Sequence, residues 1–123
     1  MGGNAALVVH GDWPDLDGAA LKAAHAAFGF AGQSCISVQR IYVDRPVFHS
    51  FLWKMADYAG KLVVGDPANE ATDVGPLIRP SDAERVETWV KEAVEGGAKI
   101  VLSGERNGSV MPPVILTGAK PGM

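Results

Sequence analysis

Short apolar segments alternate with helix-like segments along this chain, and that order restricts it to few folds. Residues 5–9 (AALVV) form a continuous apolar run, typical of a strand that is buried on both faces. After a turn that carries two aspartates, the alanine-rich residues 16–28 predict a helix. Residues 41–43 (IYV) predict a second strand, which could begin as early as Ile36. This strand–helix–strand order indicates an α/β fold with a mainly parallel sheet and covering helices.

The alternation continues after a long irregular stretch. Residues 61–80 are rich in Gly, Pro and Asp, which predicts a long loop. Pro46 suits the first turn of the helix before that loop, and Ser81 with Glu84 predicts a capping box at the start of the helix after it. The elements expected in this part are helices over about residues 46–59 and 82–95 and strands over residues 99–102 and 114–116.

Helical spacing also groups the side chains of these two helices. In the first helix one face carries Val47, Phe51, Met55 and Tyr58. In the second helix the side chains expected to point inward are Val86, Trp89, Val90 and Ala93.

Composition restricts the domain organisation and the classes of partner. The 123 residues suffice for one core, so we expect a single domain over residues 1–123. The net charge of −3 gives no electrostatic reason to expect nucleic acid, and no apolar run approaches a membrane span. A single cysteine cannot form an internal disulfide, and no signal-peptide pattern is present, so we expect a cytoplasmic protein.

That single cysteine, Cys35, lies in the segment GQSCISVQR, residues 32–40. A lone cysteine is most often a small buried apolar residue, whereas a nucleophile needs exposure and a nearby amide, helix end or cation. Gly32 permits a tight turn, and the predicted helix-to-strand junction places Cys35 at a sheet edge, where open α/β folds bind ligands. The local pattern leaves both interpretations open.

Other chemistry has no support in the sequence. The three histidines have no ligand spacing, and HExxH, GxGxxG and P-loop patterns are missing. We therefore predict no metal site and no nucleotide site built on a Gly-rich loop of this chain.

Several spaced motifs together resemble the aldehyde dehydrogenase superfamily. Residues 28–35 (FGFAGQSC) with Arg40 resemble its cysteine signature, F-x-N-x-G-Q-x-C-x-x-x-x-R. Residues 2–4 (GGN) resemble the end of its E-L-G-G-N segment, and residues 65–67 and 75–77 resemble its G-x-P and G-P-L turns. The motifs follow in order over nearly the whole chain, so the chain is similar to the cysteine-bearing part of the catalytic domain.

The resemblance implies a role for five residues. Cys35 would be the nucleophile, and its backbone N–H would form part of the oxyanion hole. Gly2 and Gly3 would let the backbone approach the nicotinamide closely, and Ser34 and Ile36 would line the substrate tunnel. The full-length parent would use NAD or NADP to oxidise an aldehyde, with neither cofactor expected bound to these 123 residues.

The same comparison places other parts of the family's machinery outside the chain. Met1 takes the Leu position of E-L-G-G-N, so the general-base glutamate would precede it, and the E-E-I-F-G-P segment would follow Met123. We therefore expect a truncated piece of the catalytic domain, without the cofactor-binding Rossmann domain, that is inactive alone. The alternative is a non-catalytic α/β structural module with a buried, inert thiol.

Two further expectations follow from the resemblance. Phe30 stands where the family usually has Asn, a departure that bears on local packing. Sheet edges and apolar faces uncovered by truncation predict a homo-oligomer.

Overall fold

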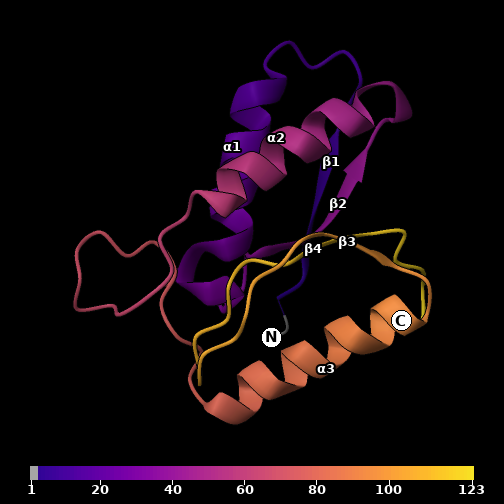
Figure 1. The fold of residues 1–123 in the computed structure, drawn as a ribbon. Coiled ribbons are helices and arrows are strands. Elements are labelled where there is room, and N and C mark those ends of the chain that lie inside the picture. The colour runs from indigo at the N-terminus through magenta and orange to yellow at the C-terminus, as the bar shows by residue number, and fades with distance from the viewer. Residues whose placement is uncertain (1–2) are drawn as a thin grey trace. The chain divides into compact units, whose positions relative to one another are not determined.

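A computed structural model describes residues 3–123 (Figure 1). The chain divides into two compact units, Met1–Leu62 and Val63–Met123, which are described separately. A single domain over residues 1–123 stays a prediction. None of the helices in residues 3–123 has the length and apolar composition of a membrane span.

The first unit contains the predicted strand–helix–strand motif. Its elements are β1 (Ala5–Val9), α1 (Leu16–Phe28) and β2 (Val38–Val43). The two strands pair in parallel, with Leu7 opposite Ile41 and Val9 opposite Val43. Asp15 caps α1 by accepting a hydrogen bond from the Gly18 N–H at 2.8 Å. The parallel pairing and the start of α1 agree with the sequence analysis.

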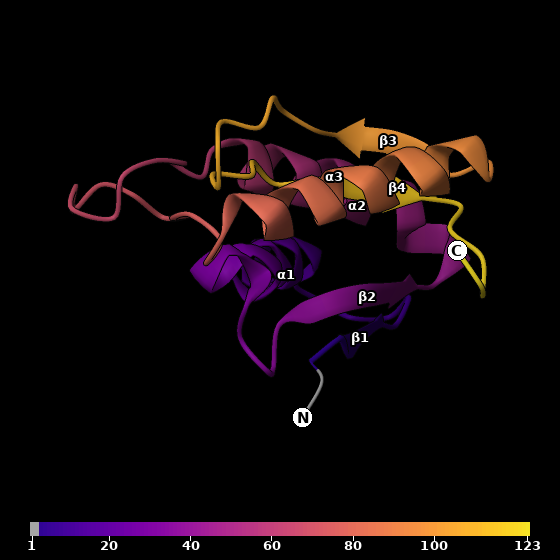
Figure 2. The same ribbon diagram turned by 90° about the horizontal axis from the view of Figure 1, so that it is seen from below.

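A second helix completes this unit. A short 3₁₀ turn, η2 (Arg45–Val47), leads into α2 (Phe48–Gly60), and Figures 1 and 2 show α1 and α2 side by side. Alanines on the buried face of α1 allow a close approach between helices, and the buried residues of the two helices are Ala20, Ala23, Ala24, Ala27, Phe51, Met55 and Ala59. Tyr58, predicted on the same face as Phe51 and Met55, is only half-buried, whereas those two are buried.

The expectation that β1 is buried on both faces is wrong. Val9 is buried, whereas Val8 is 73% exposed and its β2 partner Tyr42 is 54% exposed. Successive strand residues point to opposite faces, so one face of the pair is covered and the other is open. A groove of about 360 Å³, lined mainly by β1 and α1, adds further accessible apolar surface.

The second unit consists of α3 (Pro80–Glu95), β3 (Lys99–Leu102) and β4 (Ile115–Thr117). Its buried apolar residues are Val74, Ala83, Ala98, Pro113 and Ile115. Here β3 pairs with β4 antiparallel, because the chain returns without a crossover helix between them. The strand predicted over residues 114–116 begins one residue later, and residues 63–79 form the expected long irregular connection.

Two predictions for α3 are wrong. Its N-cap is Arg79 with no side-chain cap, so Ser81 and Glu84 form no capping box. Pro80 takes the first helical position and places Ser81 inside the helix. Trp89 is 58% exposed rather than inward, and the Arg85 guanidinium lies 5.2 Å from its ring centroid.

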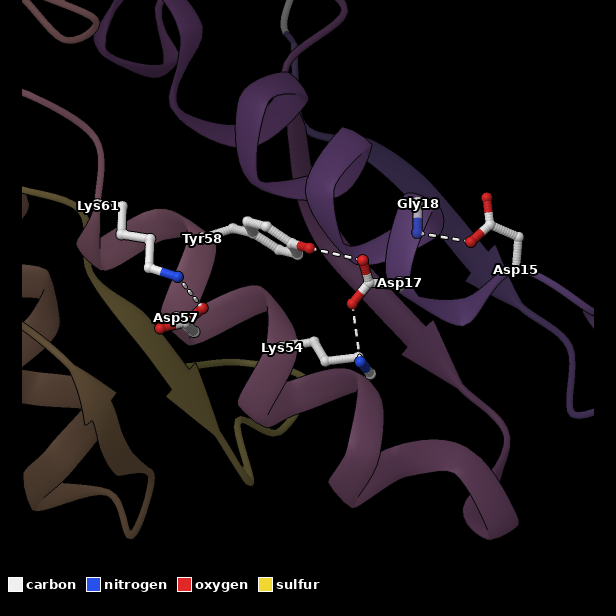
Figure 3. Close-up of polar contacts among 7 residues, drawn as sticks. All are labelled: Asp15, Asp17, Gly18, Lys54, Asp57, Tyr58 and Lys61. Carbon is white, nitrogen blue, oxygen red and sulfur yellow. Dashed lines mark hydrogen bonds and ion pairs between the residues drawn. The ribbon is translucent and has the colours of Figure 1, made fainter.

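A polar cluster joins α1 to α2 (Figure 3). Lys54 Nζ donates to Asp17 Oδ1 at 2.7 Å, and the Tyr58 hydroxyl donates to Asp17 Oδ2 at 2.6 Å. The hydrogen bond from Lys54, followed by that from Tyr58, holds the pKa of Asp17 below its ordinary value. The Tyr58 hydroxyl therefore binds a carboxylate on the neighbouring helix, and its side chain is not fully buried in the core.

We expect Asp17→Asn to lower the urea midpoint of unfolding at pH 7, because the amide loses the charge that both donors bind. The folded-state pKa of Asp17 is lowered, so its stabilisation is present above the unfolded pKa, near 3.8, and is lost as the pH falls through the folded value. The difference in urea midpoint between the wild type and Asp17→Asn should therefore become smaller as the pH is lowered.

The matched control is Asp57→Asn, which removes an ion pair between Asp57 and Lys61, the C-cap residue of the same helix. It should lower the midpoint less than Asp17→Asn does. An equal effect of Asp17→Asn at pH 7 and pH 2 would contradict the role given to the ionised carboxylate.

Candidate active site

Cys35 lies at the centre of a tight turn. The turn follows the short 3₁₀ segment η1 (Gly29–Gly32) and precedes β2. The Ser37 N–H donates to the Ser34 carbonyl oxygen at 3.0 Å, which leaves Cys35 and Ile36 as the two central residues. The thiol is exposed. This exposure contradicts the alternative of a buried thiol and meets the first requirement of a nucleophile.

The turn lies at the amino end of the parallel strand pair. The Ala5 N–H, at the start of β1, donates to the Ser37 carbonyl oxygen at 3.0 Å, just before β2 begins. Open α/β sheets usually bind ligands at the carboxyl ends of their strands, so the inference that placed Cys35 at that kind of edge is wrong. The cause is connectivity: the chain reaches the amino end of β2 directly from the carboxyl end of α1.

The pairing of β1 with β2 also brings Gly3 to the cysteine turn. A Cβ built on Gly3 would lie 3.7 Å from the Ser34 oxygen and 3.9 Å from the Cys35 oxygen. Gly3 has φ +68°, a left-handed conformation that favours glycine. The structure thus places two residues that lie 32 positions apart in the sequence next to each other. Gly2 lies outside the described residues.

The two candidate substrate residues flank the thiol within the same turn. Ser34 is half-buried, and Ile36 is 77% exposed. Both are immediate chain neighbours of Cys35, while their contact with a substrate stays a prediction.

Sequence reasoning missed the residues that fix this turn to the rest of the unit. The Ser37 hydroxyl donates to the Ala27 carbonyl oxygen at 2.9 Å and accepts from Gln39 Nε2 at 2.6 Å. On the other side of Cys35, Gln33 Nε2 donates to the Phe30 carbonyl oxygen at 3.0 Å. The available signal was Ser37 itself, a polar residue between Ile36 and Val38 in an apolar run, which proves to be 2% exposed.

The segment before the turn has an unusual backbone. Phe30, Ala31 and Gly32 have φ values of 53°, 54° and 73°, three consecutive left-handed residues. Glycine adopts this conformation freely and asparagine tolerates it, but it costs other residues about 1–2 kcal/mol. The Phe30 side chain is 83% exposed. The departure from the family's asparagine therefore affects the backbone rather than the local packing that the sequence suggested.

The arrangement combines a nucleophile with a hydrogen-bond donor. Within residues 3–123 no hydrogen bond engages the Cys35 N–H, so this amide remains available beside the exposed thiol. An amide N–H in this place is the kind of donor that stabilises an oxyanion.

His10 lies at the opposite edge of the strand pair, after the carboxyl end of β1, and its Nδ1 lies 2.6 Å from Asp12 Oδ1. Among residues 3–123, no group of three or more His, Cys, Asp or Glu side chains is placed so that it could hold a metal ion.

The fold and the cysteine turn define a class that sequence comparison identifies. The profile of the aldehyde dehydrogenase family matches residues 1–123, and the chain belongs to that family. The 3-sulfolactaldehyde dehydrogenase of Priestia aryabhattai is 51% identical over 123 residues, which are 100% of this chain and 26% of that protein. The lactaldehyde dehydrogenase of Methanococcus vannielii is 40% identical over 94% of this chain and 25% of its own length.

Solved structures of the family share the fold. The NAD-dependent aldehyde dehydrogenase of Sinorhizobium meliloti matches with a TM-score of 0.92 at 33% identity, over 100% of this chain and 25% of that one. The NADP-dependent glyceraldehyde-3-phosphate dehydrogenase of Bacillus halodurans C-125, complexed with NADP, matches with a TM-score of 0.90 at 26% identity. The match covers 100% of this chain and 25% of that one. The predicted fold class is confirmed, and the chain spans about a quarter of the length of the relatives it matches.

We expect Phe30→Asn to raise the free energy of unfolding by about 1 kcal/mol, because it relieves a left-handed phenylalanine at an exposed site. Urea titration followed by circular dichroism measures the change. The matched control is Ile36→Asn, a comparably exposed residue without a positive φ, which should give no such gain. Equal changes in the two variants would show that backbone strain is not the cause.

Proposed function

We propose that this chain supplies the nucleophile, Cys35, of an NAD(P)-dependent aldehyde dehydrogenase that converts an aldehyde to the carboxylic acid. The observation that carries the proposal is an exposed thiol in a tight turn, beside its own unengaged N–H and next to Gly3. Membership of the family supports the same activity for the whole protein.

Two covalent intermediates form on Cys35 in the proposed reaction. Its thiolate attacks the aldehyde carbon, so that a C–S bond forms and the carbonyl oxygen becomes an anion within reach of the Cys35 N–H. Loss of a hydride from this carbon, to the acceptor that NAD or NADP would supply when bound, would convert the thiohemiacetal on Cys35 to a thioester. Water then breaks the C–S bond, which releases the acid and restores the thiol.

Gly3 fits the nicotinamide side of this reaction. It is exposed, carries no side chain and lies against the Ser34 and Cys35 carbonyls, so a flat ring could approach the backbone closely. Gly2 is proposed for the same contact. Ser34 and Ile36 would border the aldehyde, because they flank the thiol.

The substrate is proposed by class. The similar proteins named above act on 3-sulfolactaldehyde and lactaldehyde, so these two aldehydes are the first to test with either cofactor. The polarity of Ser34 and the apolar surface of Ile36 do not by themselves select between them.

A chimera tests the proposal without the rest of the parent protein. These 123 residues would replace the matching segment of the Priestia 3-sulfolactaldehyde dehydrogenase, to which they are 51% identical. We expect the chimera to form NADH or NADPH from an aldehyde, and Cys35→Ser in the chimera to lower kcat by at least about a thousandfold. Cys35→Ser should leave the circular dichroism spectrum and the cofactor affinity unchanged. A Cys35→Ser chimera that keeps its activity would overturn the proposal.

The 123-residue chain alone should not reduce NAD or NADP in the presence of an aldehyde. Its thiol should nevertheless react with iodoacetamide, because Cys35 is exposed in the fold. Alkylation much faster than in a urea-unfolded control indicates an activated nucleophile. Alkylation that becomes measurable only on unfolding would instead support the inert structural module.

We also propose that the free chain associates with itself. The exposed faces of Val8 and Tyr42 and the groove beside β1 leave apolar surface in water, and β1 and β2 form a sheet of only two strands. Sedimentation should detect a dimer or larger species, and Val8→Lys should shift it toward the monomer. A monomer at high concentration in wild type would contradict this proposal.

A cytoplasmic location stays a proposal that rests on the lone cysteine.

A further inference from the structure

We infer that Ser37 is a positioning residue for Cys35, acting through the turn that holds the thiol. The inference rests on the proposed function and goes beyond it, because Ser37 itself need not touch substrate or cofactor. The inference is that Ser37 fixes the orientation of the Cys35 N–H relative to the Cys35 thiol.

The first observation is the burial of Ser37. It is 2% exposed, the only polar or charged residue of the described chain that is buried to this degree. A buried hydroxyl is costly unless both its proton and its lone pairs have partners. Here the hydroxyl donates to the Ala27 oxygen at 2.9 Å, with the Ala26 oxygen at 3.4 Å, and accepts from Gln39 Nε2 at 2.6 Å. It is therefore fully satisfied in one orientation.

The second observation concerns its acceptors. The last carbonyl groups of a helix have no partner within the helix, and Ala26 and Ala27 belong to the last turn of α1. The helix ends at Phe28, and the left-handed residues 30–32 turn the chain away from the helical path. The Ser37 hydroxyl thus ties the carboxyl end of α1 to the start of β2 from ten residues farther along the chain.

The third observation is that the backbone of the same residue holds the cysteine turn. The Ser37 N–H donates to the Ser34 oxygen, and the Ser37 carbonyl accepts from the Ala5 N–H, both at 3.0 Å. One residue therefore connects α1, the Cys35 turn and β1. Because Cys35 lies two positions before this connection, loss of the hydroxyl should let the turn move and the Cys35 N–H lose its fixed direction.

Two reactions of the 123-residue chain separate positioning from mere exposure. With p-nitrophenyl acetate, the Cys35 sulfur bonds to the acetyl carbon, the ester C–O bond breaks and p-nitrophenolate leaves, through an oxyanion that the Cys35 N–H would stabilise. With iodoacetamide, the sulfur displaces iodide and no oxyanion forms. The ratio of the two rate constants, corrected for the background of Cys35→Ser, therefore reports the direction of the amide.

We expect Ser37→Ala to lower the acylation-to-alkylation ratio by at least about tenfold, mainly through slower acylation. Ser37→Thr, which keeps the hydroxyl, should restore the ratio to within about threefold of wild type. Ser50→Ala, at an exposed position of α2, is the matched control and should leave the ratio unchanged.

A Ser37→Ala ratio within twofold of wild type would overturn the inference, as would a Ser37→Thr ratio as low as that of Ser37→Ala. If Ser37→Ala does not fold by circular dichroism, Gln39→Ala decides. It keeps the Ser37 hydroxyl but removes the 2.6 Å bond that orients it, together with a longer contact of 3.4 Å from Gln39 Nε2 to the Ala27 oxygen. A lower ratio in that variant supports the inference, and an unchanged ratio overturns it. Wild type that is alkylated but never acylated would instead refute the proposed oxyanion role of Cys35, and this inference would fall with it.

Discussion

The parallel pairing of β1 with β2 is the constraint on which the candidate site depends. It aligns the amino ends of two strands that a helix separates in the sequence, and so brings Gly3 against the carbonyls of Ser34 and Cys35. A helical crossover is the ordinary way to join parallel strands, and α1 supplies it here. The cysteine turn lies where that crossover ends, so its geometry depends on how α1 stops.

The end of α1 is set by several contacts rather than by one glycine. A left-handed turn at residues 30–32 redirects the chain, and the Ser37 hydroxyl binds the carbonyl oxygen of Ala27 that this change of direction leaves without a helical partner. At the other end of the helix, Asp17 holds Lys54 and Tyr58 of α2. The helix that carries the turn is therefore fixed at both ends by polar contacts, while its alanines pack closely between them.

The sequence predicted the positions of the helices and strands well and the contacts of individual side chains poorly. The bounds of α1 and β3 agree with the prediction, because their apolar patterns and caps are local. Tyr58 fits an apolar stripe by spacing, yet it binds Asp17 on another helix, a partner that spacing does not reveal. Trp89 also fits such a stripe, but it lies exposed against Arg85, four positions earlier on the same helix. The capping box failed because Pro80 already occupies the first helical position. Cys35 was found through resemblance, whereas Ser37 emerged only from its contacts in three dimensions.

The central claim is that catalysis in the parent enzyme passes through a covalent bond to Cys35. Its most direct test is mass spectrometry of the active chimera, quenched with acid during turnover of an aldehyde and digested with trypsin. The account predicts an acyl adduct, with the mass of the thioester, on the peptide that ends at Arg40 and contains Cys35. Steady formation of the carboxylic acid with an unmodified Cys35 peptide, or with the adduct on another residue, would contradict it.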